Sequence, residues 1–215
     1  MKVGTTRLET FSDGVMAIAI TIMVIELRLP DVVKGSTTQN IIAQLPHLLP
    51  YFITYAFSFM MISIFWTNHH NMFYLLEKTD EHLVWMNFIF LFLISLIPFA
   101  TSIVGANPFT PISPAIYGFV MFMTTTAFVV MRHYTIYKKF LHSDGDRYLT
   151  QKIFNVSVRA RTKAVAGAAI YLLSIPLAYV SVYLAYCCFI IPAIIFFIPE
   201  GIDNERLAAK VAKKN

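Results

Sequence analysis

Charged residues are scarce in this sequence of 215 residues. They make up only 13% of it, whereas a soluble domain usually carries roughly a quarter. Hydrophobic residues account for 57%, and the mean hydropathy is +0.64. A single domain of this size cannot bury so much apolar surface and still present a polar exterior to water. The composition therefore excludes an ordinary soluble domain and a disordered chain, and it predicts an integral membrane protein.

Cysteine is also scarce, and the sequence signatures typical of enzymes are missing. The two cysteines, Cys187 and Cys188, are adjacent, which excludes a disulfide framework and a cysteine metal site. No nucleophile–base arrangement, nucleotide loop or calcium loop is recognisable. We therefore expect neither an enzyme nor a resident cofactor or metal. We interpret the net charge of +5 as a determinant of membrane orientation rather than as a sign of nucleic-acid binding, because a basic excess in a membrane protein commonly sets its orientation.

Long apolar segments are what the sequence does contain. A membrane-spanning helix needs about 20 mostly apolar residues. The run Ala164–Pro199 has no charged residue and is too long for one span, so we expect two helices with a turn near 179–183. A five-span alternative stays open because neither Gly nor Asn marks that turn. The predicted fold is all-α, one domain (1–215), with six transmembrane helices at 8–29, 48–74, 83–105, 113–137, 163–180 and 182–199.

The distribution of lysine and arginine supports six spans. With both termini inside, fifteen of the 17 basic residues lie on the inner side, and only Arg28 and Lys34 lie outside. This bias follows the positive-inside rule, whereas five spans would place the basic tail outside. We therefore predict a multi-pass protein of the cell (plasma) membrane with both termini cytoplasmic. The basic segment 138–163 is interpreted as either a short cytosolic turn or an amphipathic surface helix facing acidic lipids.

Several polar residues of the first three helices are predicted to lie at a similar depth, because neighbouring helices run antiparallel. The favoured interpretation is a structural hydrogen-bond network, since buried polar groups need partners. A proton relay or pH sensor is the second interpretation. A metal site is disfavoured because adjacent histidines on a helix point about 100° apart. The residues are Arg7, Ser12, Asp13, Asn68, His69, His70 and Asn87.

The first helix also carries a narrow apolar stripe. At about 100° per residue, Asp13 points away from it and Thr21 lies at its edge. Such a stripe is usually a packing surface, which we favour from periodicity alone, but a hydrophobic constriction in a pore would look the same. The stripe consists of Phe11, Gly14, Ile18, Ile22 and Ile25.

One short motif carries a family resemblance. Arg7-x-x-x-Phe11-Ser12-Asp13, followed by the segment 14–21, closely resembles the signature of the transmembrane protein 175 family. These proteins are potassium channels of bacterial membranes and of animal endosomes and lysosomes. The segment 65–70, and Asn87 together with Leu96-Ile97-Pro98-Phe99 and Thr101, resemble two further markers. The chain has one six-helix repeat, like the bacterial members.

The resemblance implies a homotetramer in the lipid bilayer, with the first helix of each subunit lining a central pore. It assigns the narrowest ring to Ile18, the next layers to Ile22 and Ile25, and a cation-coordinating hydroxyl to Thr21. Arg7, Phe11, Ser12 and Asp13 would join a network within and between subunits, to which we add Asn68 and Asn87. The match does not separate His69 from His70 as the histidine partner.

The resulting expectation is a potassium-selective channel through a hydrophobic constriction, with potassium as a permeant ion rather than a cofactor. The alternative is a small proton-coupled secondary transporter using Asp13 with His69 or His70. Transporters often contain an internal repeat and pairs of broken helices. The sequence lacks that pattern, although Pro176 and Pro192 interrupt the last two predicted spans.

Overall fold

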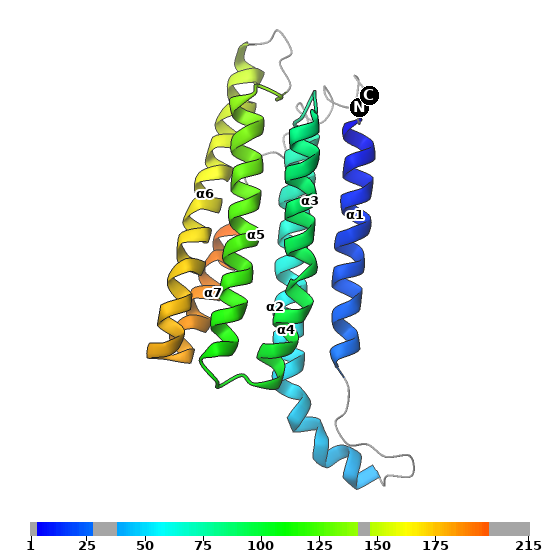
Figure 1. The fold of residues 1–215 in the computed structure, drawn as a ribbon, viewed down its shortest axis with the longest axis vertical. Coiled ribbons are helices and arrows are strands. Elements are labelled where there is room, and N and C mark those ends of the chain that lie inside the picture. The colour runs from blue at the N-terminus through cyan, green and yellow to red at the C-terminus, as the bar shows by residue number, and fades with distance from the viewer. Residues whose placement is uncertain (1–3, 28–37, 142–146, 198–215) are drawn as a thin grey trace.

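The computed structural model describes residues 4–27, 38–141 and 147–197, and this part of the chain is an α-helical bundle (Figure 1). The described residues contain no β-sheet beyond one isolated bridge between Leu76 and Leu141. In chain order the elements are α1 (Thr5–Ile22), a 3₁₀ turn η1 (Met23–Glu26), α2 (Thr38–Tyr74), α3 (Glu81–Ser95), α4 (Ile97–Ala106), α5 (Ile112–Tyr137), α6 (Arg147–Val180) and α7 (Val182–Phe197).

Five segments of the described chain are long and apolar enough to cross a membrane. They are Thr5–Ile25, Leu45–Tyr74, Glu81–Ala106, Ile112–Tyr137 and Thr150–Val180. The sixth helix, Val182–Phe197, is apolar but shorter, and it follows a break at Ser181. The prediction of an all-α membrane protein with six helices is therefore confirmed, and the long apolar run does fold into two helices.

The helix ends differ from the sequence expectation in three places. The α-helical part of α1 ends at Ile22 and tightens into η1, whereas a helix to residue 29 was predicted; residues 28 and 29 lie outside the described chain, as do 198 and 199 of the last span. The predicted third helix is interrupted at Leu96, because Pro98 has no N–H to donate to the carbonyl of Ile94.

The third difference is that α2 and α6 are much longer than their apolar segments. They contain 37 and 34 residues, and polar sequence continues the helix beyond the apolar part of each. From Arg147 onward the basic segment is thus the first part of α6 itself. Of the two interpretations of 138–163, a short turn is therefore wrong from Arg147 onward, where the chain is helical.

The helices are arranged so that α1 and α6 lie on opposite sides of the bundle (Figure 1). α3 lies beside α1, and α5 lies between α3 and α6. The α5–α6 contact is close at Gly118, where an added Cβ would lie only 2.3 Å from Ser174 Oγ. The shared core is dominated by large apolar side chains without exposure, among them Met61, Ile62, Phe90, Ile94 and Met121. α1, at one side of the bundle, is an edge helix (Figure 1).

The two ends of the bundle differ in charge. We call the end where α1 begins, and where α2 connects to α3, the basic end (Figure 1). Arg7, Lys78, Lys138 and Arg147 lie at or next to helix termini there. At the opposite end, the described segments 23–27, 38–50, 96–112 and 175–185 contain no lysine or arginine. Arg28, Lys34 and the basic tail, which also entered the orientation argument, lie outside the described residues.

Candidate functional site

The two faces of α1 have different environments. Every fourth or third residue from the helix start is buried against α2, α3 and α4. The opposite face is apolar yet exposed in the single subunit. The buried residues are Leu8, Ser12, Met16, Ala19 and Met23.

The exposed face contains the apolar stripe noted in the sequence. Ile18, Ile22 and Ile25 are 58%, 48% and 51% exposed. Thr21, also exposed, shares its hydroxyl hydrogen with the carbonyls of Ala17 and Ile18, each at 3.0 Å. Its oxygen keeps acceptor capacity toward the outside of the helix. The stripe is therefore an apolar surface that is exposed in the described part of the chain.

A buried chain of three polar side chains joins α1, α3 and α2. Asn87 Nδ2 donates to Ser12 Oγ at 2.9 Å, and Asn87 Oδ1 lies 2.9 Å from His69 Nε2. All three residues have no exposed surface. Because an amide oxygen can only accept, His69 Nε2 carries the proton of this bond. The histidine ring stacks on Phe73 at a centroid distance of 4.3 Å, which fixes its plane.

A second, more exposed pair of bonds connects α1 with α2. Trp66 Nε1 donates to Asp13 Oδ1 at 2.9 Å, and His70 Nδ1 lies 2.7 Å from Glu9 Oε1. Glu9 and Asp13 are four residues apart on α1, and Trp66 and His70 are four apart on α2. The pairs therefore form two rungs between antiparallel helices. The structure thus gives the two histidines different partners, a distinction that the sequence left open.

Two members of these bonds, Glu9 and Trp66, were not predicted as site residues. The signal that could have found them is the spacing of four residues, which puts Glu9 on the face of Asp13 and Trp66 on the face of His70. The antiparallel arrangement of α1 and α2 also predicts that Glu9 and Trp66 lie at a depth in the membrane similar to that of the other predicted residues.

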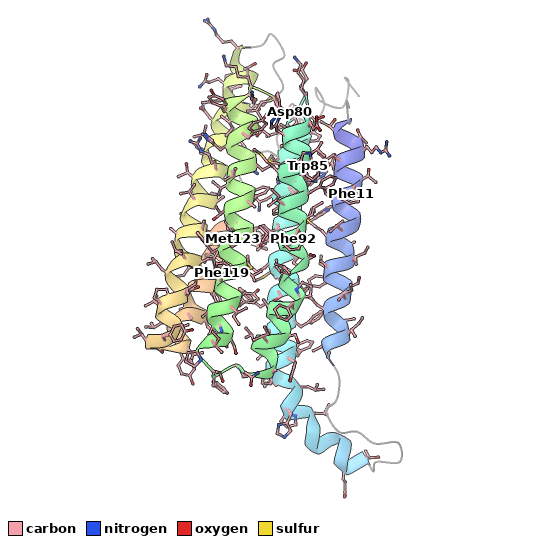
Figure 2. All side chains as sticks on the ribbon, viewed as in Figure 1. Phe11, Asp80, Trp85, Phe92, Phe119 and Met123 are labelled. Carbon is pink, nitrogen blue, oxygen red and sulfur yellow. The ribbon has the colours of Figure 1, made fainter. Side chains whose placement is uncertain are left out.

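The remaining predicted residues are not joined to the buried chain. Arg7 is exposed and forms no hydrogen bond or ion pair with the residues that the structure describes. The Asn68 side chain donates to Ile64 O within its own helix at 2.9 Å. Phe11 contacts Phe88 edge to face, with ring centroids 5.7 Å apart. Figure 2 shows Phe11 and Trp85 on neighbouring helices, toward the end of the bundle that also carries Asp80.

Another buried polar cluster, also missed from the sequence as a cluster, joins α2, α4 and α5. The hydroxyl of Ser58 lies 2.8 Å from that of Thr101 and 3.0 Å from that of Tyr117. Thr101 had been noted only as part of a family marker. Its hydroxyl also lies 3.8 Å from the sulfur of Met23, so this cluster touches the α1 segment through a weak acceptor.

Groups of three or more histidine, cysteine, aspartate or glutamate side chains able to hold a metal ion do not occur among the described residues. One ring nitrogen of each histidine is hydrogen-bonded, His69 Nε2 to Asn87 and His70 Nδ1 to Glu9, whereas His69 Nδ1 is buried without a hydrogen-bond partner. These hydrogen bonds fix α1 against α2 and α3, while the other face of α1 stays apolar and exposed.

Comparison with known proteins identifies the family. A family model described as "Endosomal/lysosomal potassium channel TMEM175" matches residues 7–98. A potassium channel of Chryseobacterium sp. (strain P1-3) is 33% identical over 90% of this chain and 93% of its own length. The chain belongs to the TMEM175 family. This confirms the resemblance stated from the sequence, and it confirms that the chain is not an enzyme, because the TMEM175 proteins are ion channels.

A structural neighbour within the TMEM175 family has the same fold. The crystal structure of a lysosomal potassium-selective channel TMEM175 homolog from Chamaesiphon minutus matches with a TM-score of 0.76 and 26% identity, covering 92% of this chain and 98% of that one. An animal relative, the endosomal/lysosomal proton channel TMEM175 of Danio rerio, is 30% identical over 47% of this chain and 21% of its own length.

Proposed function

We propose that this protein is a potassium channel whose pore is lined by α1 of several copies of the chain. The observation that carries the proposal is the exposed stripe of Ile18, Ile22 and Ile25 on an edge helix of a TMEM175 family member. Relatives from Chryseobacterium and Chamaesiphon minutus that cover most of the chain are named potassium channels. One helix cannot enclose a path, so it must be repeated around an axis, and cyclic symmetry supplies that repetition. A homotetramer is the assembly we propose.

The proposed constriction is formed by isoleucine side chains. Apolar rings can gate a pore by excluding water, with Ile18 as the narrowest ring and Ile22 and Ile25 as the next layers. Isoleucine supplies no oxygen to replace the hydration shell, so selection rests on the cost of partial dehydration, which is smaller for potassium than for sodium. The Thr21 oxygen offsets part of that cost next to the ring. Selectivity built in this way is weaker than that of a cage of carbonyl oxygens.

The hydrogen bonds on the other face of α1 have a supporting role in this proposal. The buried chain from Ser12 through Asn87 to His69, and the contacts of Asp13 and Glu9 with α2, hold the first half of α1 at a fixed rotation. Rotation decides which side chains face the axis. We assign Arg7, Phe11 and Asn68 to the surroundings of this network and, for Arg7 and Phe11, to contacts between subunits.

The orientation proposed is the one that the basic residues favour. The basic end of the bundle faces the cytoplasm, the opposite end faces outward, and the protein resides in the plasma membrane of the cell. The charge asymmetry of the described helix ends supports this orientation.

Ion flux into liposomes tests the function. The purified protein should carry potassium down its gradient, with a faster flux for potassium than for sodium. Ile18→Asn should lower the ratio of potassium to sodium flux, because a polar ring hydrates the constriction. The matched control is Ile194→Asn, the same substitution at a position on α7 that is 61% exposed. Absence of potassium flux, or an unchanged ratio in Ile18→Asn, would contradict the proposal.

Proton passage is the second candidate. The observation that favours it is the name of the animal relatives, endosomal/lysosomal proton channels, although they match less than half of the chain. A pH-sensitive dye inside the same liposomes distinguishes the two ions. A proton flux that persists without potassium, and that Ile18→Asn changes in parallel, would support a shared path.

A further inference from the structure

An apolar cavity lies between α2, α4, α5 and α7, near the end of the bundle opposite the basic end. Its volume is about 480 Å³, within the range of roughly 300–1,000 Å³ that is typical of small-molecule sites. Part of its wall is almost completely buried, namely Tyr117 of α5 and Phe189 of α7. Another part is exposed and consists of Leu49 and Ile53 of α2 and Ile190 of α7. The cavity therefore extends into the bundle and opens between α2 and α7.

The lining of this cavity suits an apolar occupant. None of the described residues that line it is charged. Three of them carry hydroxyl groups, and each hydroxyl is already hydrogen-bonded within the protein. The pairs are Thr54 with the carbonyl of Pro50, Tyr117 with Ser58, and Tyr186 with the carbonyl of Pro108. A buried water needs about two to four polar partners, so water is a poor occupant of this cavity.

The cavity extends in depth along the helices. On α2 its lining runs from Leu49 to Phe57, which is about 12 Å along the helix axis. Both residues lie within the membrane-spanning segment Leu45–Tyr74. At the end nearer the membrane surface, the lining includes Pro108 and Phe109 of the connection between α4 and α5. Since one leaflet contains about 15 Å of hydrocarbon, the cavity covers most of one leaflet from its surface inward.

We propose that this cavity binds one acyl chain of a membrane phospholipid, from the leaflet at the end opposite the basic end. The carboxyl end of the chain lies beside Phe109, and its methyl end lies beside Phe57 and Ile190. The bilayer supplies acyl chains directly at the opening between α2 and α7, and a cavity extended along the membrane normal fits a chain better than a compact solute. An empty cavity would forfeit van der Waals contacts of its walls, which the chain restores. The headgroup stays outside, so the site selects the chain and not the headgroup.

Photocrosslinking in liposomes tests the site without any ion-flux measurement, so its outcome is independent of the potassium proposal. The probe is phosphatidylcholine with a diazirine on one acyl chain, and mass spectrometry of peptides locates the labelled residues. A diazirine near the carboxyl end of the chain should label the protein next to Phe109, and one near the methyl end should label it next to Phe57. Label should also reach Phe189, which is buried and meets an acyl chain only inside the cavity. Absence of label at Phe57 and Phe189, or the reverse order along the chain, would overturn the proposal.

A matched pair of substitutions on α7 tests the position of the chain. Ile190→Trp adds volume at the opening and should lower the labelling of Phe189 by about tenfold, because a chain and the larger ring would overpack the cavity. Ile194→Trp, at an exposed position one turn further and outside the lining, should lower it by less than about twofold. Equal reductions in the two variants would overturn the site.

The headgroup provides a second test, which uses the natural protein alone and so holds even where Ile190→Trp does not fold. Phosphatidylglycerol with the same diazirine chain should label Phe189 to within about twofold of phosphatidylcholine, because nothing in the lining is charged. Labelling by only one of the two lipids would overturn the assignment of the cavity to the acyl chain.

Discussion

The protein has two buried polar clusters, one toward each end of the helical bundle, and they connect different helices. Toward the basic end, Ser12 of α1 is bonded directly to Asn87, which bonds His69. Toward the opposite end, Ser58, Thr101 and Tyr117 join α2, α4 and α5 without a hydrogen-bonding side chain from α1. There the α1 segment contributes only the sulfur of Met23.

The difference shows how one helix can be both anchored and adjustable. The first half of α1 is tied to its subunit by strong bonds at Ser12, Asp13 and Glu9. Its second half, which carries Ile18, Ile22 and Ile25, is held by apolar packing and ends in the 3₁₀ turn η1. Apolar packing is not directional, so this half can shift against its neighbours at a lower cost than the first. The second polar cluster stabilises the frame around it, beside an apolar cavity of about 480 Å³ that Tyr117 helps to line.

Asn87→Leu should produce the largest loss of stability. It removes two hydrogen bonds, worth about 1 kcal/mol each, and leaves His69 Nε2 buried without a partner at a further cost of about 1–3 kcal/mol, whereas Ser12 keeps its bond to Leu8 O. We expect the free energy of unfolding in detergent to fall by about 3–5 kcal/mol. Asn68→Leu is the matched control, because that amide bonds only its own helix through Ile64 O. Equal losses in the two variants would show that the cluster does not anchor α1.

Asp80→Ala should have the next largest effect, because Asp80 anchors the basic end through two bonds. Its carboxylate accepts the N–H of Leu83 at the start of α3 and the hydroxyl of Tyr134 on α5. Loss of a helix cap costs about 1 kcal/mol, so we expect about 1–2 kcal/mol in total. Thermal unfolding in detergent at neutral pH measures this loss, and Glu81→Ala, in the same turn, is the control. A midpoint unchanged from that of the control would contradict the anchoring role.

The stabilisation that Asp80 provides should depend on pH. Burial raises the pKa of Asp80, but the hydrogen bonds from Tyr134 and Leu83 outweigh it, so the pKa lies below its ordinary value of 3.8. A carboxyl with a lowered pKa stabilises the fold above its unfolded-state pKa and loses this contribution as the pH falls through the folded-state pKa. The stability difference between the natural protein and Asp80→Ala should therefore shrink below about pH 4. A difference that stays constant down to pH 3 would contradict it.

Tyr117→Phe should destabilise less than either anchor at the basic end. It removes one hydroxyl from the second cluster, while Ser58 keeps Thr101 as a partner, so about 1 kcal/mol is expected. Unfolding in detergent gives the value, and Tyr137→Phe, at a position 74% exposed, is the control. A loss as large as that of Asn87→Leu would abolish the contrast between the two clusters.

The spans and the family can be predicted from the sequence, whereas the helix lengths and the helix break cannot. Hydropathy is sufficient to find the spans, and a specific heptapeptide is sufficient to find the family. Helix length is different, because polar residues such as Gln151 and Lys152 continue α6 without an apolar signal. The break at Leu96 depends on a single missing N–H in Pro98.

Partner assignment depends on how helices rotate against each other, which periodicity in one helix does not define. His69 and His70 point about 100° apart, so the rotation of α2 about its axis decides which of them faces α1. Ser58, Thr101 and Tyr117 were overlooked for another reason. Single hydroxyl residues are common in membrane helices, and only the packing of three helices shows that these three meet.

Asp13→Asn should have the smallest effect, and it separates a channel from a proton-coupled transporter. Asparagine keeps an oxygen at the position of Oδ1, so Trp66 Nε1 retains its acceptor and α1 keeps its rotation. We expect the unfolding free energy to change by less than about 1 kcal/mol and potassium flux in liposomes to persist. Asp13→Leu, which removes the acceptor, is the comparison. A transporter that uses the Asp13 carboxyl to carry protons requires the opposite result, loss of pH-driven flux in Asp13→Asn with the fold intact. Such a loss would show that Asp13 carries protons in transport and does not only anchor α1.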